Sequence, residues 1–136
     1  MVRQIVIKKV DKPRNIDFEK DVQWLCDSFG FSTGRDSSNI SMSILTGILK
    51  EISLQGSTST ESISKKLGLE VQRVNYHLRY LIDLGLLYRS KRRIFIREGS
   101  ISLAIEEIRD DVNKIFDCMT KIGEDIDKKL GFEKRR

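Results

Sequence analysis

The sequence predicts a mainly α-helical protein that carries one small β-hairpin. Apolar residues recur at spacings of three and four through most of the 136-residue chain, which is the period of amphipathic helices. Between residues 86 and 97 the spacing changes to two, the period of β-strands, and residues 2–10 also alternate loosely. Glycines stand where two of the helical patterns end, at Gly68 and Gly85, and a glycine ends a helix at little steric cost.

Composition indicates one globular domain with an extension. Hydrophobic residues make up 39% and charged residues 33% of the chain, and one proline is present. No apolar run approaches the roughly 18 residues that span a bilayer, and the first ten residues lack the order of a signal peptide, so we expect a cytoplasmic protein. Cys26 and Cys118 lie far apart and have no basic neighbours, which favours buried structural thiols over a disulfide, a metal site or a redox sensor.

Residues 1–38 are predicted to form an N-terminal strand-helix extension. The loosely alternating, Val- and Ile-rich start predicts a strand, and Pro13 lies in the turn that ends it. The spacing of Phe18, Val22 and Leu25 then predicts a helix over residues 17–29, which Asp17 or Asn15 would cap. The extension's role stays open between a dimer contact, an effector pocket and a second DNA contact.

Residues 39–99 are predicted to form the central domain. A helix over residues 40–54 follows a polar loop, with Ser38 or Asn39 as its N-cap. A shorter helix over residues 61–67, capped by Thr60, turns at Gly68 into a helix over residues 71–84. After Gly85 the alternating segment predicts a two-stranded hairpin with Lys91 and Arg92 near its tip. The element order is helix, short strand, helix, turn, helix and hairpin, which is the order of a winged helix-turn-helix.

Positive charge is concentrated in this domain. Residues 60–99 hold nine basic and four acidic groups, a net +5, whereas residues 1–59 come to +1 (eight minus seven) and residues 100–136 to −1 (eight minus nine). The outward positions of the helix over residues 71–84 contain no carboxylate between Glu70 and Asp83. A solvated face normally mixes both signs, so this distribution favours a polyphosphate partner. The outward positions are Gln72, Arg73, Asn75, Tyr76, Arg79 and Tyr80.

The segment SISKKLGLEVQRVNYHLRYLIDLGLLYRSKRRIFIR resembles winged helix-turn-helix transcription regulators of the ArsR/MarR kind, found in archaea and bacteria. The resemblance covers about residues 40–99 and rests on the apolar and glycine pattern followed by a basic wing. It implies a homodimeric, sequence-specific regulator of double-stranded DNA, with a recognition helix over residues 71–84 and no cofactor. The Cys pair or terminal His and Asp ligands of metal-sensing members are missing, so no metal site is expected. The expected DNA-binding residues are Gln72, Arg73, Asn75, Tyr76, His77, Arg79, Arg89, Lys91, Arg92 and Arg93. For His77, a phosphate contact and a helix-packing role both stay open.

Residues 100–136 are predicted to form a C-terminal dimerisation helix. Its apolar residues are spaced alternately four and three apart, which is a heptad seam of about four repeats. Packing of this seam on its own domain is the alternative to dimerisation, and Gly123 weakens the last turns. The seam consists of Ile101, Ile105, Ile108, Val112, Ile115, Met119, Ile122 and Ile126.

Two other classes of protein are less favoured. An enzyme would need a nucleophile beside a His, a metal spacing or a phosphate loop, and the glycine loop around Gly34 fits none of these patterns, so no catalytic residue is expected. A winged helix that binds protein or RNA, as in basal transcription or chromosome-associated complexes, shares the fold. It would not be expected to keep a basic, acid-free surface over residues 72–97.

Overall fold

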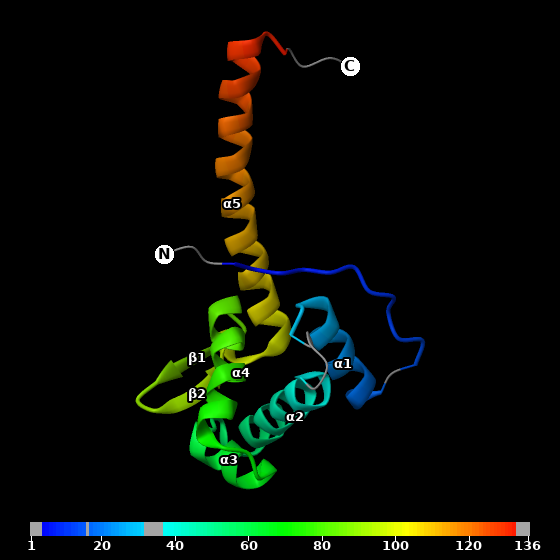
Figure 1. The fold of residues 1–136 in the computed structure, drawn as a ribbon, viewed down its shortest axis with the longest axis vertical. Coiled ribbons are helices and arrows are strands. Elements are labelled where there is room, and N and C mark those ends of the chain that lie inside the picture. Colours follow the sequence, from blue (N-terminus) through cyan, green and yellow to red (C-terminus); the bar gives the residue numbers. More distant parts are fainter. Residues whose placement is uncertain (1–3, 16, 32–36, 133–136) are drawn as a thin grey trace.

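The protein is described by a computed structural model that covers residues 4–15, 17–31 and 37–132, with the backbone alone for residues 37–39. Within these ranges the chain is mainly helical and has one two-stranded sheet, as the sequence predicted (Figure 1). The elements are α1 (Phe18–Ser28), α2 (Ser37–Gln55), α3 (Thr60–Leu67), α4 (Val71–Leu84), β1 (Leu87–Ser90), β2 (Arg93–Ile96), the 3-10 turn η1 (Arg97–Gly99) and α5 (Ile101–Leu130).

One hydrophobic core joins α2, α3, α4, the hairpin and the beginning of α5. Its fully buried side chains include Ile44, Ile63, Leu78, Ile94 and Ile108, one from each of these elements. Helix α1 closes the core from the N-terminal side through Val22 and Cys26. Most of these residues belong to the apolar patterns from which the helices were predicted. Ile94 instead lies in the alternating hairpin, and Ile108 lies in the seam that was predicted for dimerisation.

The helix ends agree with the predicted signals, with two corrections. Gly68 (φ 68°) and Gly85 (φ 96°) end α3 and α4 in the left-handed conformation, and the Asp17 carboxylate caps α1. The predicted N-caps of the other two helices are wrong. Ser59, not Thr60, caps α3 by accepting a hydrogen bond from the Ser62 amide. Helix α2 begins at Ser37, so Ser38 and Asn39 lie within it, while Gly34 lies outside the described residues.

The expected N-terminal strand is also wrong. Residues 4–13 are extended but unpaired, and they run across α5 and along the end of α1 (Figure 1). The Lys8 amide donates to the Ser28 carbonyl (2.6 Å), and the Trp24 indole donates to the Val10 carbonyl (3.0 Å). An extended apolar segment becomes a strand only beside a free sheet edge. Here the segment meets helices, and Ile5 packs against the core while Ile7 stays 60% exposed.

Helix α5 begins on the domain and then projects away from it (Figure 1). Ala104 and Ile108 are buried in the core, whereas Ile115, Met119 and Ile126 are each about half exposed. The first three turns of α5 therefore pack on their own domain, which was the alternative to dimerisation. The later turns do not contact the domain in this way. Within the described ranges, no helix combines the length and apolar character needed to cross a membrane.

Candidate nucleic-acid interface

Helix α4 is held by α3 on one side and by the hairpin on the other. Val74, Leu78 and Leu81 are buried along its inner side, which fixes the rotation of the helix about its axis. The opposite side is consequently solvent-facing. Gln72, Arg73 and Arg79 are exposed there, and Tyr76 is 74% exposed.

Asn75 lies between this face and the wing. Its Oδ1 accepts a hydrogen bond from the Thr60 hydroxyl (3.0 Å) and another from Arg89 Nη2 (3.2 Å). Arg89 also lies 3.5 Å from the Thr60 hydroxyl. Since a bidentate contact to adenine needs the amide oxygen, Asn75 in this geometry joins α3, α4 and β1 more directly than it reads a base.

His77 and Tyr80 point away from the solvent-facing side of α4. His77 is only 7% exposed, and its Nδ1 lies 3.3 Å from the Ser41 hydroxyl of α2. Burial, and then the charge of Arg73, lower the pKa of His77. The Tyr80 hydroxyl donates to the Phe29 carbonyl, its ring packs on Phe31, and burial raises its pKa. For His77 the geometry fits the helix-packing role, and the outward position expected for Tyr80 is wrong. The helical period predicts which residues face outward only to within one or two positions. His77 and Tyr80 lie at the edge of the outward face of α4, where α2 and the end of α1 cover them.

The hairpin forms the wing, and its two strands are joined by a basic turn of two residues. Ser90 pairs with Arg93, so Lys91 and Arg92 alone form the turn, as the sequence predicted. Both have positive φ values, 50° and 66°, which fit the turn type that suits the right-handed twist of a hairpin. Both side chains are exposed. The wing therefore carries two adjacent cations at the point that extends farthest along the hairpin.

Besides Arg89, two more of the five basic residues of the wing segment bind within the protein. Arg93 donates through Nε to the Ser57 hydroxyl (3.0 Å) and through Nη2 to the Ser57 carbonyl (3.1 Å). Arg97 forms a 2.9 Å ion pair with Asp111 of α5 and lies 3.7 Å from Glu107. The hydrogen bond that Arg97 donates to Asp111 is the main cause that raises the pKa of Arg97. These arginines fasten the wing to α5 and to the segment before α3.

A buried polar cluster that the sequence pattern did not reveal sets the position of α3. One oxygen of Glu51, in α2, accepts hydrogen bonds from the hydroxyls of Thr58 (2.8 Å) and Ser62. The Ser62 hydrogen bond is the main cause that lowers the pKa of Glu51. Thr58 in turn exchanges two backbone hydrogen bonds with Ile94 of β2. In the sequence, Glu51 is visible only as a carboxylate at a helical position that faces the core. Its partners Thr58 and Ser62 come from other segments, so the sequence pattern does not reveal the cluster.

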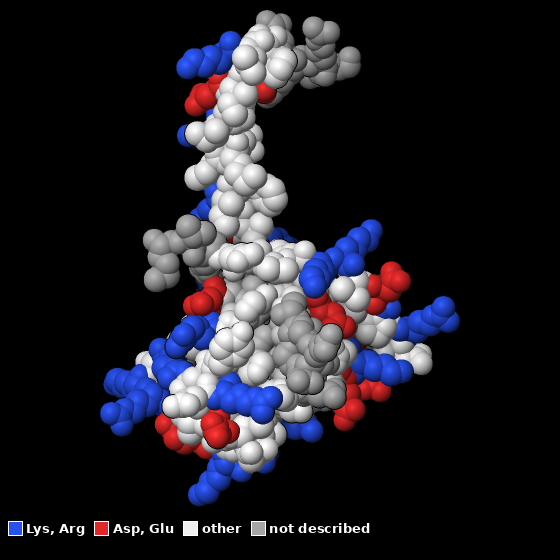
Figure 2. Space-filling model, in the orientation of Figure 1, with Lys and Arg blue, Asp and Glu red and all other residues white. Residues whose placement is uncertain are grey.

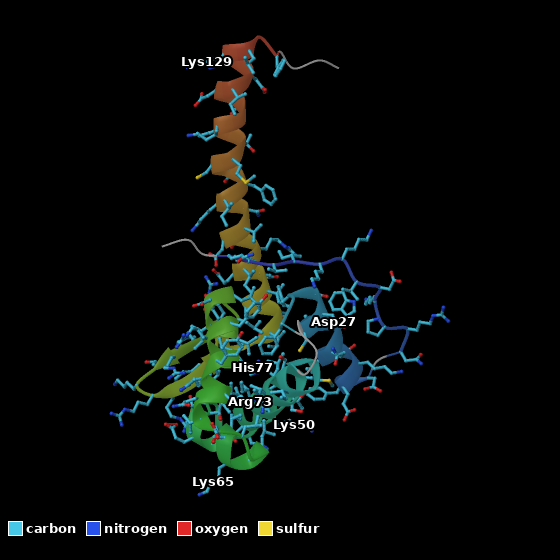
Figure 3. All side chains as sticks on the ribbon, in the orientation of Figure 1. Asp27, Lys50, Lys65, Arg73, His77 and Lys129 are labelled. Atoms are coloured by element: carbon cyan, nitrogen blue, oxygen red, sulfur yellow. The ribbon has the colours of Figure 1, made fainter. Side chains whose placement is uncertain are left out.

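Basic side chains dominate the surface that α4 and the wing form together. Figure 2 shows Lys and Arg over the hairpin at the left of the view and over α4, with acidic side chains below them toward α3. In Figure 3, Arg73 lies one turn from His77 on α4, and Lys65 lies at the far end of α3. The acid-free region is thus limited to residues 71–82 of α4 and the wing tip, because Asp83 is exposed at the end of α4. On α3, which adjoins this region at its lower side (Figure 1), Glu61 is an exposed carboxylate.

The cysteines differ in their surroundings. Cys26 is buried in the core, as predicted, whereas Cys118 is exposed on the projecting part of α5. The expectation of a buried thiol is therefore wrong for Cys118. Its helix leaves the domain before reaching it, which the local sequence does not reveal.

Helices α2, α3 and α4 with the hairpin define a winged helix-turn-helix domain, the fold class that the sequence predicted. Residues 44–88 match the family model described as "Winged helix-turn-helix DNA-binding". The match begins within α2 and ends in β1, so it covers the helix-turn-helix and leaves the N-terminal extension and α5 unmatched. No curated protein and no solved structure matches the chain.

Proposed function

We propose that the protein is a sequence-specific transcription regulator that binds double-stranded DNA as a homodimer. The observation that carries this proposal is the continuous solvent-facing surface of α4 and the wing, which is basic and polar and lies on a segment that matches a DNA-binding family model. An α-helix fits the major groove, and a hairpin beside it reaches the phosphate backbone.

Gln72, Arg73 and Tyr76 are the proposed reading residues. Arg73 has the guanidinium fork that makes a bidentate contact to guanine, and Gln72 has the amide that pairs with adenine. Tyr76 offers a ring for a thymine methyl and a hydroxyl for a phosphate. All three are exposed near the N-terminal half of α4, the part of a recognition helix that meets base edges.

Lys91 and Arg92, together with Arg79 and Arg89, are the proposed phosphate contacts. Each phosphate neutralised releases counterions, so binding should weaken as salt rises. Asn75 acts here as a positioning residue, because its side-chain oxygen already holds Arg89 and Thr60. His77 and Tyr80 are left out of the proposed DNA contacts because they are turned inward and bonded to Ser41 and Phe29. Arg93 is left out because it is half-buried and donates to Ser57 through both Nε and Nη2, whereas Arg89 is kept because its side chain is exposed.

The projecting part of α5 is the proposed dimer contact. Ile115, Met119, Ile122 and Ile126 form an apolar stripe that is about half exposed, and a helical stripe of this kind is buried when two copies associate. The first residues of the predicted seam have another role. Ile101, Ile105, Ile108 and Val112 pack against the core of their own domain.

Selection of bound fragments from random duplex DNA by the full-length chain, at two salt concentrations, tests the proposal. We expect an enriched, two-fold symmetric sequence and an affinity that falls steeply with salt. A matched selection from random RNA serves as the comparison. Enrichment from the RNA pool alone, or equal retention of all duplexes at both salt concentrations, would contradict the proposal.

A further inference from the structure

An apolar groove at the base of α5 is a surface that the proposed function leaves unexplained. The groove has a volume of about 290 Å³ and lies between the N-terminal segment, α1 and α5. Trp24, Phe29, Ile105 and Val112 are among its apolar walls, and Lys8 and Arg109 are exposed at its edge. Resting on the proposed homodimer, we propose that the groove receives the C-terminal end of α5 from a second copy, so that the two α5 helices pair antiparallel.

The direction of the apolar stripe supports this pairing. Ala104 and Ile122 lie 18 residues apart, as do Ile108 and Ile126, and 18 residues are five turns at 3.6 residues per turn. The side of α5 that is buried in its own domain is therefore the same side that is exposed farther along. A partner helix must approach the exposed stripe from the side on which the domain lies.

A parallel partner conflicts with this arrangement. It would bring its own domain to the same level along the helix and to the same inner side, where the first domain already packs on Ala104 and Ile108. An antiparallel partner places its domain at the opposite end of the helix pair. Each domain then lies beyond the end of the other protomer's α5, and both stripes are covered.

The residue pairs also fit the antiparallel direction. With Ile115 opposite Ile126 of the second copy, Met119 lies opposite its Ile122, which closes two apolar layers. Phe116 then lies near Gly123 of the second copy, where a Cβ would meet nothing within 4 Å and a large ring finds room. In a parallel pair, Phe116 would instead face Asp111, and branched Ile would occupy the d positions at Ile115 and Ile122, where two-stranded parallel coils prefer Leu.

The same register brings the end of the second α5 to the groove. In this register the numbers of two facing residues sum to about 241. Leu130 of the second copy therefore lies at the level of Asp111, and its Phe132 lies at the level of Arg109. Leu130 and Phe132 are exposed in the single chain, at 64% and 62%. Arg109 and Lys8 would lie beside the C-terminal carbonyls of the partner helix, where cations are favourable for the helix dipole.

Disulfide trapping in the full-length chain tests the pairing. Two variants, Ile115→Cys and Ile126→Cys, are made in a Cys118→Ser background, distinguished by mass, mixed in equal amounts and oxidised. We expect a disulfide that joins the thiol introduced at position 115 of one chain to the thiol introduced at position 126 of the other, and little of either homodimer.

The outcomes separate this inference from the proposed homodimer. Homodimeric disulfides alone would show parallel pairing and overturn the inference while leaving the dimer standing. A dimer in sedimentation that forms none of these disulfides would also overturn it. A monomer in sedimentation at micromolar concentration would overturn both the inference and the proposed dimer.

The groove is tested separately through Trp24, the single tryptophan of the chain. Leu130→Ser should weaken dimerisation at least about tenfold, because each dimer loses two buried leucines, and should abolish a concentration-dependent change in Trp24 emission. Lys128→Ser, on the outer side of the same turn, is the matched control and should change neither measurement. Equal behaviour of the two variants would contradict the assignment of the groove.

Discussion

Arg73 illustrates how a single exposed side chain is assigned a role. It follows Glu70 by one helical turn, lies on the solvent-facing side of α4, and its charge contributes to lowering the pKa of the buried His77. Its neighbours on the inner side of α4, Val74 and Leu78, are buried in the core, whereas the Arg73 side chain is exposed. A residue that is exposed and cationic on this face is suited to binding a polyphosphate.

Replacement of Arg73 by Lys should separate specificity from affinity. Lysine keeps the charge but loses the bidentate fork, so the preference for the matching base should fall by about 1–3 kcal/mol while affinity for unrelated DNA stays nearly unchanged. Arg73→Ala should lower both quantities. Binding titrations with the selected sequence and with one-base variants measure the difference. An unchanged sequence preference in Arg73→Lys would exclude Arg73 from base reading.

His77 makes folding stability depend on pH. Burial lowers its pKa in the folded protein, whereas the unfolded chain has the ordinary value of about 6.5. As pH falls below about 6.5, the unfolded state takes up a proton more readily than the folded state, so stability is lost toward low pH. We expect a smaller free energy of unfolding at pH 5.5 than at pH 7.5, measured by urea denaturation.

His77→Gln provides the control for this pH dependence. Glutamine keeps a polar group near Ser41 but does not titrate, so its stability should change little between the two pH values. Glu51, whose pKa is lowered from about 4.5, loses its contribution only at lower pH and does not interfere. An equal pH dependence in both proteins would show that another group is responsible.

At the scale of elements, the wing combines a binding role with a conformational cost. Lys91 and Arg92 both adopt left-handed backbone angles, which side chains other than Gly and Asn adopt at a cost of about 1 kcal/mol or more. Asparagine followed by glycine is the preferred pair for such a two-residue turn. The chain instead has two cations there, which fits selection for phosphate binding over hairpin stability.

The double variant Lys91→Asn, Arg92→Gly should therefore be more stable and bind less tightly. We expect its free energy of unfolding to rise by about 1 kcal/mol, because the turn is relieved. Affinity for all DNA sequences should fall alike. The slope of log affinity against log salt should flatten by about two for each bound protomer, and so by about four for the proposed homodimer. The control variant Lys114→Gln, Lys121→Gln on α5 removes the same charge far from the wing. A fall in sequence preference without a change in salt slope would contradict the phosphate role.

At the scale of the whole molecule, antiparallel α5 helices would set the distance between the DNA-binding domains. In the proposed register the two-fold axis passes near residue 120, so the starts of the two helices lie about 58 Å apart at 1.5 Å per residue. Half-sites on one face of DNA recur every ~34 Å. We expect the selected half-sites to be separated by two helical turns or more. Half-sites one turn apart would contradict the antiparallel dimer.

The sequence by itself determined the helices of the central domain, the two glycine turns, the hairpin and its basic tip. These follow from local rules: apolar period, backbone freedom of glycine and charge spacing act within a few residues of each other. The exposed positions of Gln72, Arg73 and Tyr76 also followed from the period of α4.

Tertiary structure decided what depends on partners from distant segments. It buried His77 against Ser41, turned Tyr80 toward Phe29 and fastened Arg93 to Ser57, although the sequence pattern left each of them available for DNA. Among the described residues, the N-terminal segment has no neighbouring strand with which to pair, so it does not form one. The heptad seam of α5 is continuous in sequence, but its first part packs on the domain and its later part projects away from it. A sequence pattern shows that a side chain is apolar or charged, but only the arrangement of the elements determines which surface it meets.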